Sequence, residues 1–309
     1  MRFNKLDLNL LVALDAMLKA RSISRAAEAL HITQPAMSNA LARLRAYFGD
    51  DLLVPVGRKM ALTPRAETLQ EAVRDVLLRV DATITALPQF DPAQSERWFR
   101  LFLSDYTSLT LIPHLLTLAA RASTSLRFEL LPQVDQPQRA LERGEADLLV
   151  MPAIYCAPNH PLDILLEEAF CCVVWQGSDH ARQGSISQVA YAAAGHVVMQ
   201  PPGSSQPSFE TGQMQVLGLV RRVQVSAFSF VTAAAAVVGT ERIATVHLRL
   251  ARQLGRSLPI AVLPLPVAMA PMQQAMQWHK YRSQDPGLVW LRGLMHRAVV
   301  AMDAAAPVQ

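Results

Sequence analysis

The sequence has few cysteines and few charged residues for its length. Three Cys occur among 309 residues, at Cys156, Cys171 and Cys172. An odd number cannot be fully paired in disulfides, and the spacing is not the CxxC of zinc or redox sites. Only 17% of the residues are charged and 51% are hydrophobic, which excludes a disordered chain. We therefore expect a globular, cytoplasmic protein, with two domains as the default at this length.

Long hydrophobic runs are also missing. The apolar segment 8–14 is flanked or interrupted by Asp7, Asn9 and Asp15, and no signal-peptide cleavage site follows it. The most apolar later segment, 228–238, is too short to span a bilayer. We therefore expect neither export nor a membrane partner.

Enzyme motifs are absent as well. No GxSxG elbow, GxGxxG fingerprint or P-loop occurs, and the eight His show no HExxH or HxH spacing. We expect no catalytic residues, no bound metal and no cofactor. Two alternatives stay open: an enzyme whose site is assembled from distant residues, and a protein that only binds a small molecule, like a solute-binding protein.

Positive charge is concentrated in the first fifth of the chain. Residues 1–62 contain nine Lys and Arg against five Asp and Glu, whereas the remainder contains twenty of each. The whole-chain net charge of +4 therefore belongs to the N-terminal segment. This asymmetry suggests an N-terminal module that binds a polyanion, joined to a neutral body.

The N-terminal segment predicts a helix-turn-helix at about residues 23–42. A helix over 8–18 precedes it, and Ser22 or Ser24 then offers an N-cap for a short helix of small residues. Thr33 is the next N-cap, with Pro35 in the first turn, and the third helix runs to Phe48. Two short helices joined by a tight turn form a helix-turn-helix.

The third helix has an apolar face and a polar face. Met37, Leu41, Leu44 and Phe48 recur at helical spacing and are expected in the core. The opposite face presents Gln34, Ser38, Asn39 and Arg43, whose side chains can hydrogen-bond to bases or phosphates in a major groove. A merely solvated polar face is the alternative, and the adjacent short helix argues against it.

A short hairpin is predicted after the third helix. Strands at 51–54 and 60–62 flank the tip 55–59, which contains Gly57, Arg58 and Lys59. Such a β-wing places its basic tip against phosphates or the minor groove.

These motifs together resemble a LysR-type transcriptional regulator. The matching segments are LDLNLL at 6–11, SRAAEAL at 24–30, TQPAMS at 33–38 and LTP at 62–64. The resemblance implies that Gln34, Pro35, Ser38 and Asn39 approach the bases and that the wing touches the DNA backbone. Many family members carry Arg at the position of Asn39, so the preferred base is left open. The predicted DNA-binding residues are Ser24, Arg25, Thr33, Gln34, Pro35, Ser38, Asn39, Arg43, Arg58 and Lys59.

A linker helix is predicted within residues 63–90. The apolar residues Ala66, Leu69, Val73, Val76 and Val80 repeat at alternating spacings of three and four, which is a heptad seam. A helix of about 24 residues is about 36 Å long. We expect the seam to pair with a second copy, and packing of the helix on its own body is the alternative. The resemblance likewise implies a dimer through this helix and usually a homotetramer.

The remainder of the chain predicts a mostly parallel α/β fold, because short apolar runs alternate with helical patterns. The predicted strands are 99–104, 126–131, 147–151, 171–175, 196–199, 222–225, 242–246 and 260–263. The predicted helices are 113–121, 137–143, 186–194, 229–238, 248–254 and 287–300.

Ligands in such folds lie at the carboxyl ends of strands. The LysR resemblance adds a periplasmic-binding-protein-like effector domain over 95–303, in which a small effector lies between two α/β subdomains. We place subdomain I at about 95–166 and 266–303, and subdomain II at about 167–265. The predicted effector-binding residues are Ser104, Asp105, Tyr106, Thr107, Pro152, Ser204, Phe228, Val246 and His279.

Further segments resemble one branch of the family, the nodulation-gene activators and the regulators of aromatic-compound degradation. They are MRF at 1–3, RFELLP at 127–132, and WHKY, DPG and WLR within 278–292. The resemblance implies a planar aromatic effector such as a flavonoid, an aromatic acid or a phenol. The expected function is an effector-responsive DNA-binding regulator and not an enzyme. Activation is the expected sign of regulation, although members of the family both activate and repress.

Overall fold

The computed structural model describes residues 6–57, 59–82, 89–133, 136–201, 203 and 207–305. The chain divides into an N-terminal and a C-terminal compact unit, which are described separately. Within the described ranges no helix is both long enough and apolar enough to cross a membrane.

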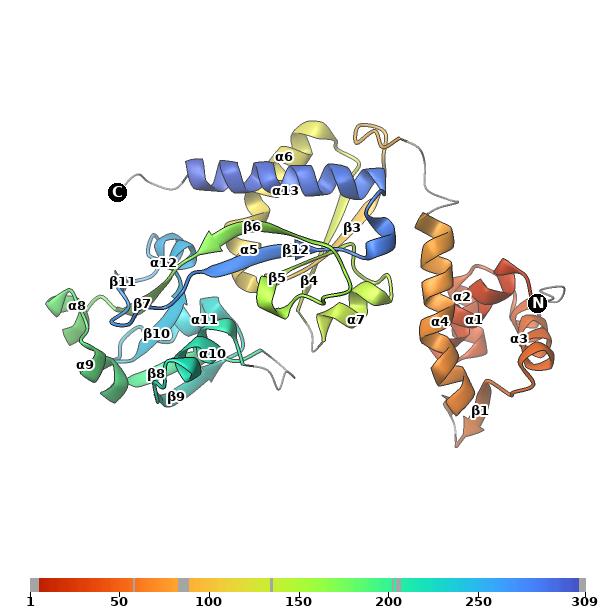
Figure 1. Ribbon diagram of the computed structural model, residues 1–309, viewed down its shortest axis with the longest axis horizontal. Helices are drawn as coiled ribbons and strands as arrows, with labels where there is room; N and C mark the ends of the chain where they lie inside the picture. Colours follow the sequence, from red (N-terminus) through yellow and green to blue (C-terminus); the bar gives the residue numbers. More distant parts are fainter. Residues whose placement is uncertain are drawn as a thin grey trace. The chain divides into compact units, whose positions relative to one another are not determined.

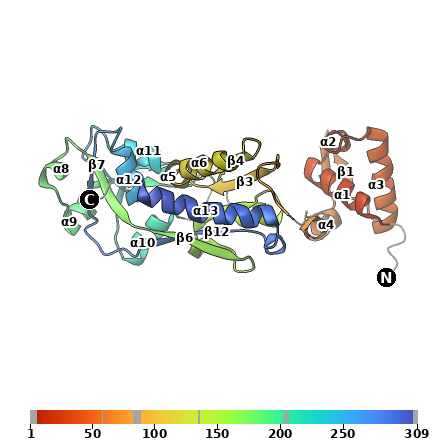
Figure 2. The same ribbon diagram turned by 90° about the horizontal axis from the view of Figure 1, so that it is seen from above.

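The N-terminal unit consists of three short helices, a hairpin and a longer helix (Figure 2). Its elements are α1 (Leu8–Ala20), α2 (Ile23–Ala29), α3 (Gln34–Phe48), β1 (Leu53–Val56), β2 (Lys59–Leu62) and α4 (Pro64–Val80). Ser22, Thr33 and Thr63 each cap the helix that follows, accepting a hydrogen bond from a backbone N–H in its first turn. Gly49 ends α3 at φ +63°, a conformation that suits glycine. The sequence prediction of a helix-turn-helix followed by a hairpin is confirmed.

The wing hairpin reaches further than the sequence predicted. Pro55 pairs with Met60 and Val56 pairs with Lys59, so both strands extend into the expected tip. Lys59 therefore begins β2, and the turn is tight around Gly57, at φ +62°. Arg58 lies outside the described residues.

Helix α4 packs part of its predicted seam, namely Ala66, Leu69 and Val73, against its own unit. Ala66 and Val73 are buried in the same core as Leu14, Met17 and Met37 of α1 and α3. The expectation that the seam faces a second copy is therefore wrong for Ala66 and Val73, since the heptad pattern also describes a helix lying on its own core, whereas Val76 is exposed. The predicted length is longer than α4, which ends at Val80; residues 83–88 lie outside the described part.

The C-terminal unit contains two five-stranded sheets (Figure 1). Subdomain I has the strand order β4-β3-β5-β12-β6, formed by β3 (Trp98–Leu103), β4 (Arg127–Pro132), β5 (Leu148–Pro152), β6 (Leu162–Glu168) and β12 (Met272–Gln277). Subdomain II has the order β11-β7-β10-β8-β9, formed by β7 (Phe170–Trp175), β8 (Gly195–Met199), β9 (Arg222–Ala227), β10 (Ile243–His247) and β11 (Ile260–Leu263). The chain passes between the sheets from β6 to β7 and from β11 to β12.

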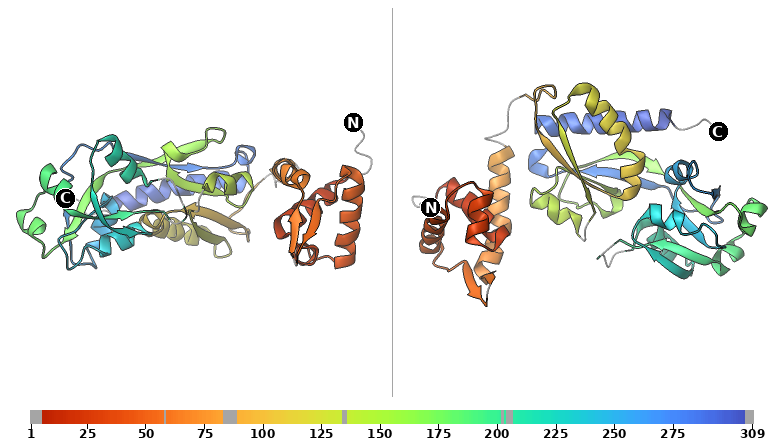
Figure 3. Two further views of the ribbon diagram at one scale, coloured as in Figure 1. Left: turned by 90° about the horizontal axis from the view of Figure 1, so that it is seen from below. Right: turned by 180° about the vertical axis from the view of Figure 1, so that it is seen from behind.

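Successive residues of a strand point to opposite faces of the sheet, so a run of buried residues makes both faces apolar. Helices therefore cover both faces of each sheet. In subdomain I, Leu101 and Val150 pack with α6 (Ile112–Ala122) and α13 (Pro286–Ala304), which lie side by side (Figures 1 and 3). Phe102 and Leu149 face the opposite layer, α7 (Pro137–Glu142).

The remaining elements are α5 (Asp105–Thr110), the 3₁₀ turns η2 (Ala153–Tyr155) and η3 (Lys280–Arg282), α8 (Asp179–Gln183), α9 (Gln188–Ala193), α10 (Phe209–Val216), α11 (Phe230–Ala235) and α12 (Leu248–Leu254).

The sheets are mixed, and the prediction of a mostly parallel fold needs correction. Each sheet has two parallel and two antiparallel pairings. The antiparallel pairings involve the strands at the two crossovers, and two of these, β6 and β12, were not predicted. Strand β12 reads Met-Gln-Gln-Ala-Met-Gln, so its hydropathy does not mark it as buried, although Gln274 and Gln277 are 2% and 0% exposed.

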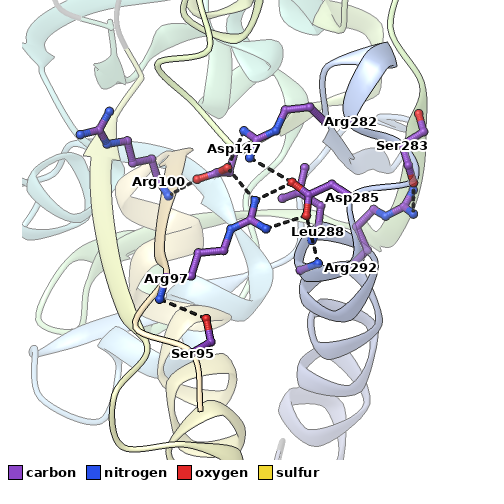
Figure 4. Close-up of polar contacts among 10 residues, drawn as sticks. Ser95, Arg97, Arg100, Asp147, Arg282, Ser283, Asp285, Leu288 and Arg292 are labelled. Carbon is purple, nitrogen blue, oxygen red and sulfur yellow. Dashed lines mark hydrogen bonds and ion pairs between the residues drawn. The ribbon is translucent and has the colours of Figure 1, made fainter. Parts of the chain in front are cut away.

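A partly buried ion cluster joins three elements of subdomain I (Figure 4). Asp285 caps α13 and forms two hydrogen bonds with the Arg97 guanidinium, at 2.6 and 2.7 Å. Arg282 bridges Asp285 at 3.1 Å and Asp147 at 2.7 Å. Asp147 in turn accepts a hydrogen bond from the backbone N–H of Arg100 in β3. The cluster therefore ties the start of α13 to β3 and to the loop before β5.

Candidate functional site

Helix α3 presents a polar face to solvent and an apolar face to the core. Met37, Leu41 and Leu44 are at most 3% exposed, whereas the side chains of Gln34, Ser38, Asn39 and Arg43 are exposed. Pro35 is also exposed, in the first turn. The Thr33 hydroxyl accepts a hydrogen bond from the N–H of Ala36, which leaves its own proton available to a ligand.

A basic hollow adjoins this face. It measures about 610 Å³ and lies where the end of α1, the start of α2, the start of α3 and strand β2 meet. Four predicted residues line it: Ser24, Arg25, Gln34 and Lys59. Lys19 and Arg21 line it too, and sequence reasoning missed both. Both cations directly precede the helix-turn-helix in the sequence, and this position could have identified them as DNA-binding candidates.

Two arginines of α3 have different roles. Arg43 forms an exposed ion pair with Asp7 at 3.2 Å. The pKa of Asp7 is lowered, chiefly by a hydrogen bond from the N–H of Leu10 and further by Arg43. Arg45 instead donates to the backbone oxygens of Asp51 and Leu53, both at 2.8 Å. Arg45 therefore supports the wing, and Arg43 has a guanidinium on the surface.

The second site is a pocket between the two subdomains, here named the front pocket. Its volume is about 130 Å³. It is lined by Ser104, Tyr106, Gln133, Gln136, Pro137, Gln138, Met151, Pro152, Tyr155, Met272 and Gln274 from subdomain I, and by Met199, Pro201, Pro207, Ser208, Phe209, Phe230 and His247 from subdomain II. Both subdomains thus supply its walls.

Five predicted effector residues lie in or beside the front pocket. Ser104, Tyr106 and Pro152 line it directly. Asp105 accepts a hydrogen bond from the N–H of Val231 at 2.8 Å, which joins α5 of subdomain I to α11 of subdomain II. Burial raises the pKa of Asp105, and hydrogen bonds from Val231 and its neighbours oppose that shift. Thr107 is buried and accepts a hydrogen bond from the Gln274 amide at 3.1 Å.

The other predicted effector residues do not line the front pocket. Phe228 is 68% exposed, because the turn into α11 directs Phe230, two residues later, into the pocket instead. Val246 is packed inside subdomain II, and its neighbour His247 is the lining residue. His279 packs beside His160, with 4.8 Å between ring centroids, away from the pocket. Ser204 lies outside the described residues.

Sequence reasoning missed the glutamines of the pocket. Gln133, Gln136 and Gln138 follow the carboxyl end of β4, and Gln274 comes from the unpredicted strand β12. The rule that ligands lie at the carboxyl ends of strands could have identified the first three.

The described lining of the front pocket carries no formal charge. None of the lining residues within the described ranges is Asp, Glu, Lys or Arg. His247 is fully buried against Tyr106, with 3.9 Å between ring centroids, and burial lowers its pKa to about 3. The Tyr106 hydroxyl donates to Glu168 at 2.5 Å, and burial and that carboxylate raise its pKa. Both rings are therefore uncharged at neutral pH.

Two buried polar atoms of the pocket lining have no partner among the described residues. They are Gln274 Oε1 and His247 Nδ1. A buried polar atom left unpaired costs about 1–3 kcal/mol, so a ligand that pairs with these atoms gains affinity.

Comparisons with known proteins agree with this geometry. Residues 8–67 match the family model described as bacterial regulatory helix-turn-helix protein, lysR family, and residues 92–299 match the LysR substrate binding domain. The chain is 38% identical over 304 residues to nodulation protein D 2 of Sinorhizobium fredii (strain NBRC 101917 / NGR234), covering 98% of this chain and 97% of the relative.

Solved structures show the same architecture. The probable transcriptional regulator PA0477 from Pseudomonas aeruginosa superposes with a TM-score of 0.66 at 26% identity, covering 95% of this chain and 97% of the other. A full-length OxyR variant from Pseudomonas aeruginosa has the same fold, with a TM-score of 0.74 at 16% identity, covering 95% and 94%.

Proposed function

The chain belongs to the LysR family of bacterial transcriptional regulators, and from that premise we propose that it binds operator DNA through α3 and the basic hollow. The observation that carries this proposal is the exposed polar face of α3 beside Ser24, Arg25 and Lys59. Amides such as Gln34 and Asn39 suit base edges in the major groove, whereas cations such as Arg25 and Lys59 suit phosphates. The proposed contact surface also includes Thr33, Pro35, Ser38, Arg43 and the wing residue Arg58.

We propose that the effector is an uncharged, planar aromatic molecule with hydroxyl groups, such as a flavonoid, bound in the front pocket. A carboxylate buried there would meet no cation of the lining, which costs free energy. Aromatic walls such as Tyr106, Tyr155 and Phe209 suit a flat ring. A phenolic hydroxyl can donate to Gln274 Oε1 and can either donate to or accept from His247 Nδ1.

The proposed mechanism is a change in subdomain closure. An effector that contacts both subdomains stabilises one closure angle, to which Asp105 and Val231 already contribute a hydrogen bond. Closure then changes how protomers pack, and with it the spacing of the DNA-binding units. We propose a dimer through the outer face of α4, assembling to a tetramer in the cytoplasm, and activation of transcription. A dimer suits DNA half-sites about one helical turn apart.

A thermal-shift experiment on the full chain tests the effector proposal. A hydroxylated flavone should raise the melting temperature of the C-terminal unit, because a ligand at about 100 times its Kd stabilises by about 2.7 kcal/mol. Any shift with benzoate, which carries a charge, should be the same in wild type and in Gln274→Leu, because the front pocket has no described cation to pair with a carboxylate. The variant Gln274→Leu should lose most of the flavone shift, and Gln188→Leu, at an exposed position of α9, should keep it. A full flavone shift in Gln274→Leu, or a benzoate shift that Gln274→Leu abolishes, contradicts the proposal.

A further inference from the structure

A second cavity lies in the C-terminal unit and shares no lining residue with the front pocket. This rear cavity measures about 450 Å³. Its walls are the α5–α6 junction, the crossover residues Glu167 to Ala169, helix α12 and the last turn of α13. It therefore contacts both subdomains at the crossover from β6 to β7.

Three cations line the rear cavity. Arg249 and Arg252 come from α12, where a spacing of three places them on one helix face, and Arg256 lies in the turn that follows the helix. Arg249 is already paired, with Glu168 at 3.2 Å and Asp303 at 3.0 Å. Arg252 and Arg256 have no carboxylate partner among the described residues. Of the acidic lining residues, only Glu167 forms no ion pair there, so two unpaired guanidiniums face one unpaired carboxylate.

The rest of the lining is largely apolar. Leu109, Pro113, Leu248 and Met302 border the cavity next to the guanidinium groups. A guanidinium binds a carboxylate through two parallel hydrogen bonds, and an apolar body attached to that carboxylate would cover these side chains. From this arrangement we propose that the rear cavity is a second ligand site, which takes a small organic carboxylate through Arg252 and Arg256.

The rear cavity and the front pocket meet at one buried carboxylate. Glu168 is 1% exposed and accepts from the Tyr106 hydroxyl at 2.5 Å and from Arg249 Nη1 at 3.2 Å. Tyr106 lines the front pocket and Arg249 lines the rear cavity. A carboxylate held by Arg252 and Arg256 adds a negative charge to the cavity that Arg249 also lines, where it competes with Glu168 for this cation and so alters the hydrogen bond that positions Tyr106. The two ligands then change each other's affinity by the same factor.

Calorimetric titration of the full chain with hexanoate tests this proposal, with neutral hexanamide as the matched probe. Hexanoate should bind at least about tenfold more tightly than hexanamide, since tenfold corresponds to about 1.4 kcal/mol. The double variant R252Q/R256Q should lose that preference. The control variant Arg121→Gln removes an exposed cation of α6 that does not line the cavity, and it should keep the preference.

Folding and site assignment are checked separately. Arg252 and Arg256 form no ion pair in the described part of the chain, so the double variant should melt at the wild-type temperature. The front-pocket variant Gln274→Leu should still bind hexanoate. Unchanged hexanoate affinity in R252Q/R256Q, lost affinity in Gln274→Leu, or equal affinity for hexanoate and hexanamide would overturn the proposal. The DNA and effector proposals do not depend on this outcome, because they rest on other residues.

Discussion

Two buried histidines of subdomain II are held in their neutral form. Burial lowers the pKa of His196 to about 4 and that of His247 to about 3. His196 Nε2 donates to the backbone oxygen of Tyr191 at 2.7 Å, and His247 lies between aromatic rings. In the unfolded chain both imidazoles take up a proton near pH 6.5. The unfolded state therefore binds more protons than the folded state at mildly acidic pH.

We predict that the C-terminal unit loses stability between pH 6.5 and about pH 3 as a result, with the contribution of His196 complete near pH 4. Stability from a depressed histidine pKa is fully present above the unfolded pKa and is lost as the pH falls below it. At pH 5 each histidine should cost about 2 kcal/mol relative to pH 7. All four Trp belong to the C-terminal unit, so denaturant unfolding followed by Trp fluorescence measures this loss. The variant His247→Gln should lose about 2 kcal/mol less than wild type, and an equal loss would contradict the assignment.

The burial of a residue was predictable where it depends only on the position of that residue in a single helix. The spacing of Met37, Leu41 and Leu44 predicted their burial, because a single helix fixes which side chains share a face. Phe228 and Phe230 differ by only two residues at a strand-to-helix junction, and the local turn decides which one enters the pocket. Gln274 could not be found from hydropathy, because its burial depends on its neighbours in the sheet.

At the scale of elements, the ion cluster at the start of α13 holds a helix, a strand and a loop together. Burial raises the pKa of Asp285, but hydrogen bonds from Arg97 and the charges of Arg97 and Arg282 outweigh it, so the pKa is lowered. The carboxylate therefore stabilises the fold above the unfolded pKa of about 3.9, and that contribution is lost as the pH falls below it.

We predict that Asp285→Asn destabilises the C-terminal unit by about 2–4 kcal/mol, because it removes one of the two carboxylates that Arg97 and Arg282 share and leaves only Asp147 to balance two cations. Asparagine can still cap α13, so the loss of stability measures the missing negative charge and not a missing helix cap. The matched control is Asp303→Asn on the same helix, whose pair with Arg249 is more exposed and should cost about 0–1 kcal/mol. Urea unfolding at neutral pH measures both. Equal losses in the two variants would show that the cluster has no special role.

Helix α4 shows why a heptad pattern did not identify its partner. Apolar residues at spacings of three and four line one helix face, but the pattern does not say whether that face meets a second copy or its own unit. Val73 is 4% exposed in the N-terminal core, whereas Val76 is 41% exposed. The proposed dimer contact must therefore use the outer face, which includes Val76.

We predict that Val76→Glu weakens self-association by at least about tenfold while leaving the N-terminal unit folded, because about 1.4 kcal/mol of apolar contact is removed. Val73→Glu should instead unfold that unit, since it buries an unpaired charge. Sedimentation velocity and far-UV circular dichroism distinguish the two results. If Val76→Glu sediments as wild type at every concentration, the outer face of α4 is not the dimer contact.

At the scale of the whole molecule, the excess positive charge and the uncharged front pocket belong to different units. The excess of cations lies within residues 1–62, and the front pocket of the C-terminal unit has no charged residue in the part of its lining that the structure describes. The local alternation of strands and helices predicted the α/β class, but not the two sheets or their antiparallel strands. Those strands pair across long sequence separations, as β12 does with β5 and β6, and no local pattern encodes that pairing.

The charge separation predicts how DNA binding depends on salt. Each phosphate neutralised by Lys or Arg adds about 0.9 to the magnitude of the slope of log K against log salt. Lys59→Ala should therefore weaken binding to operator and unrelated DNA alike and flatten the slope by about one.

Ser38→Ala should weaken operator binding alone, by about 1–3 kcal/mol if its hydroxyl contacts a base, with the slope unchanged. Fluorescence anisotropy between low and moderate salt measures both, with Thr68→Ala on α4 as the exposed-hydroxyl control. A salt-independent affinity, or identical behaviour of Lys59→Ala and Ser38→Ala, would contradict the assignment of phosphate contacts to the wing and base contacts to α3.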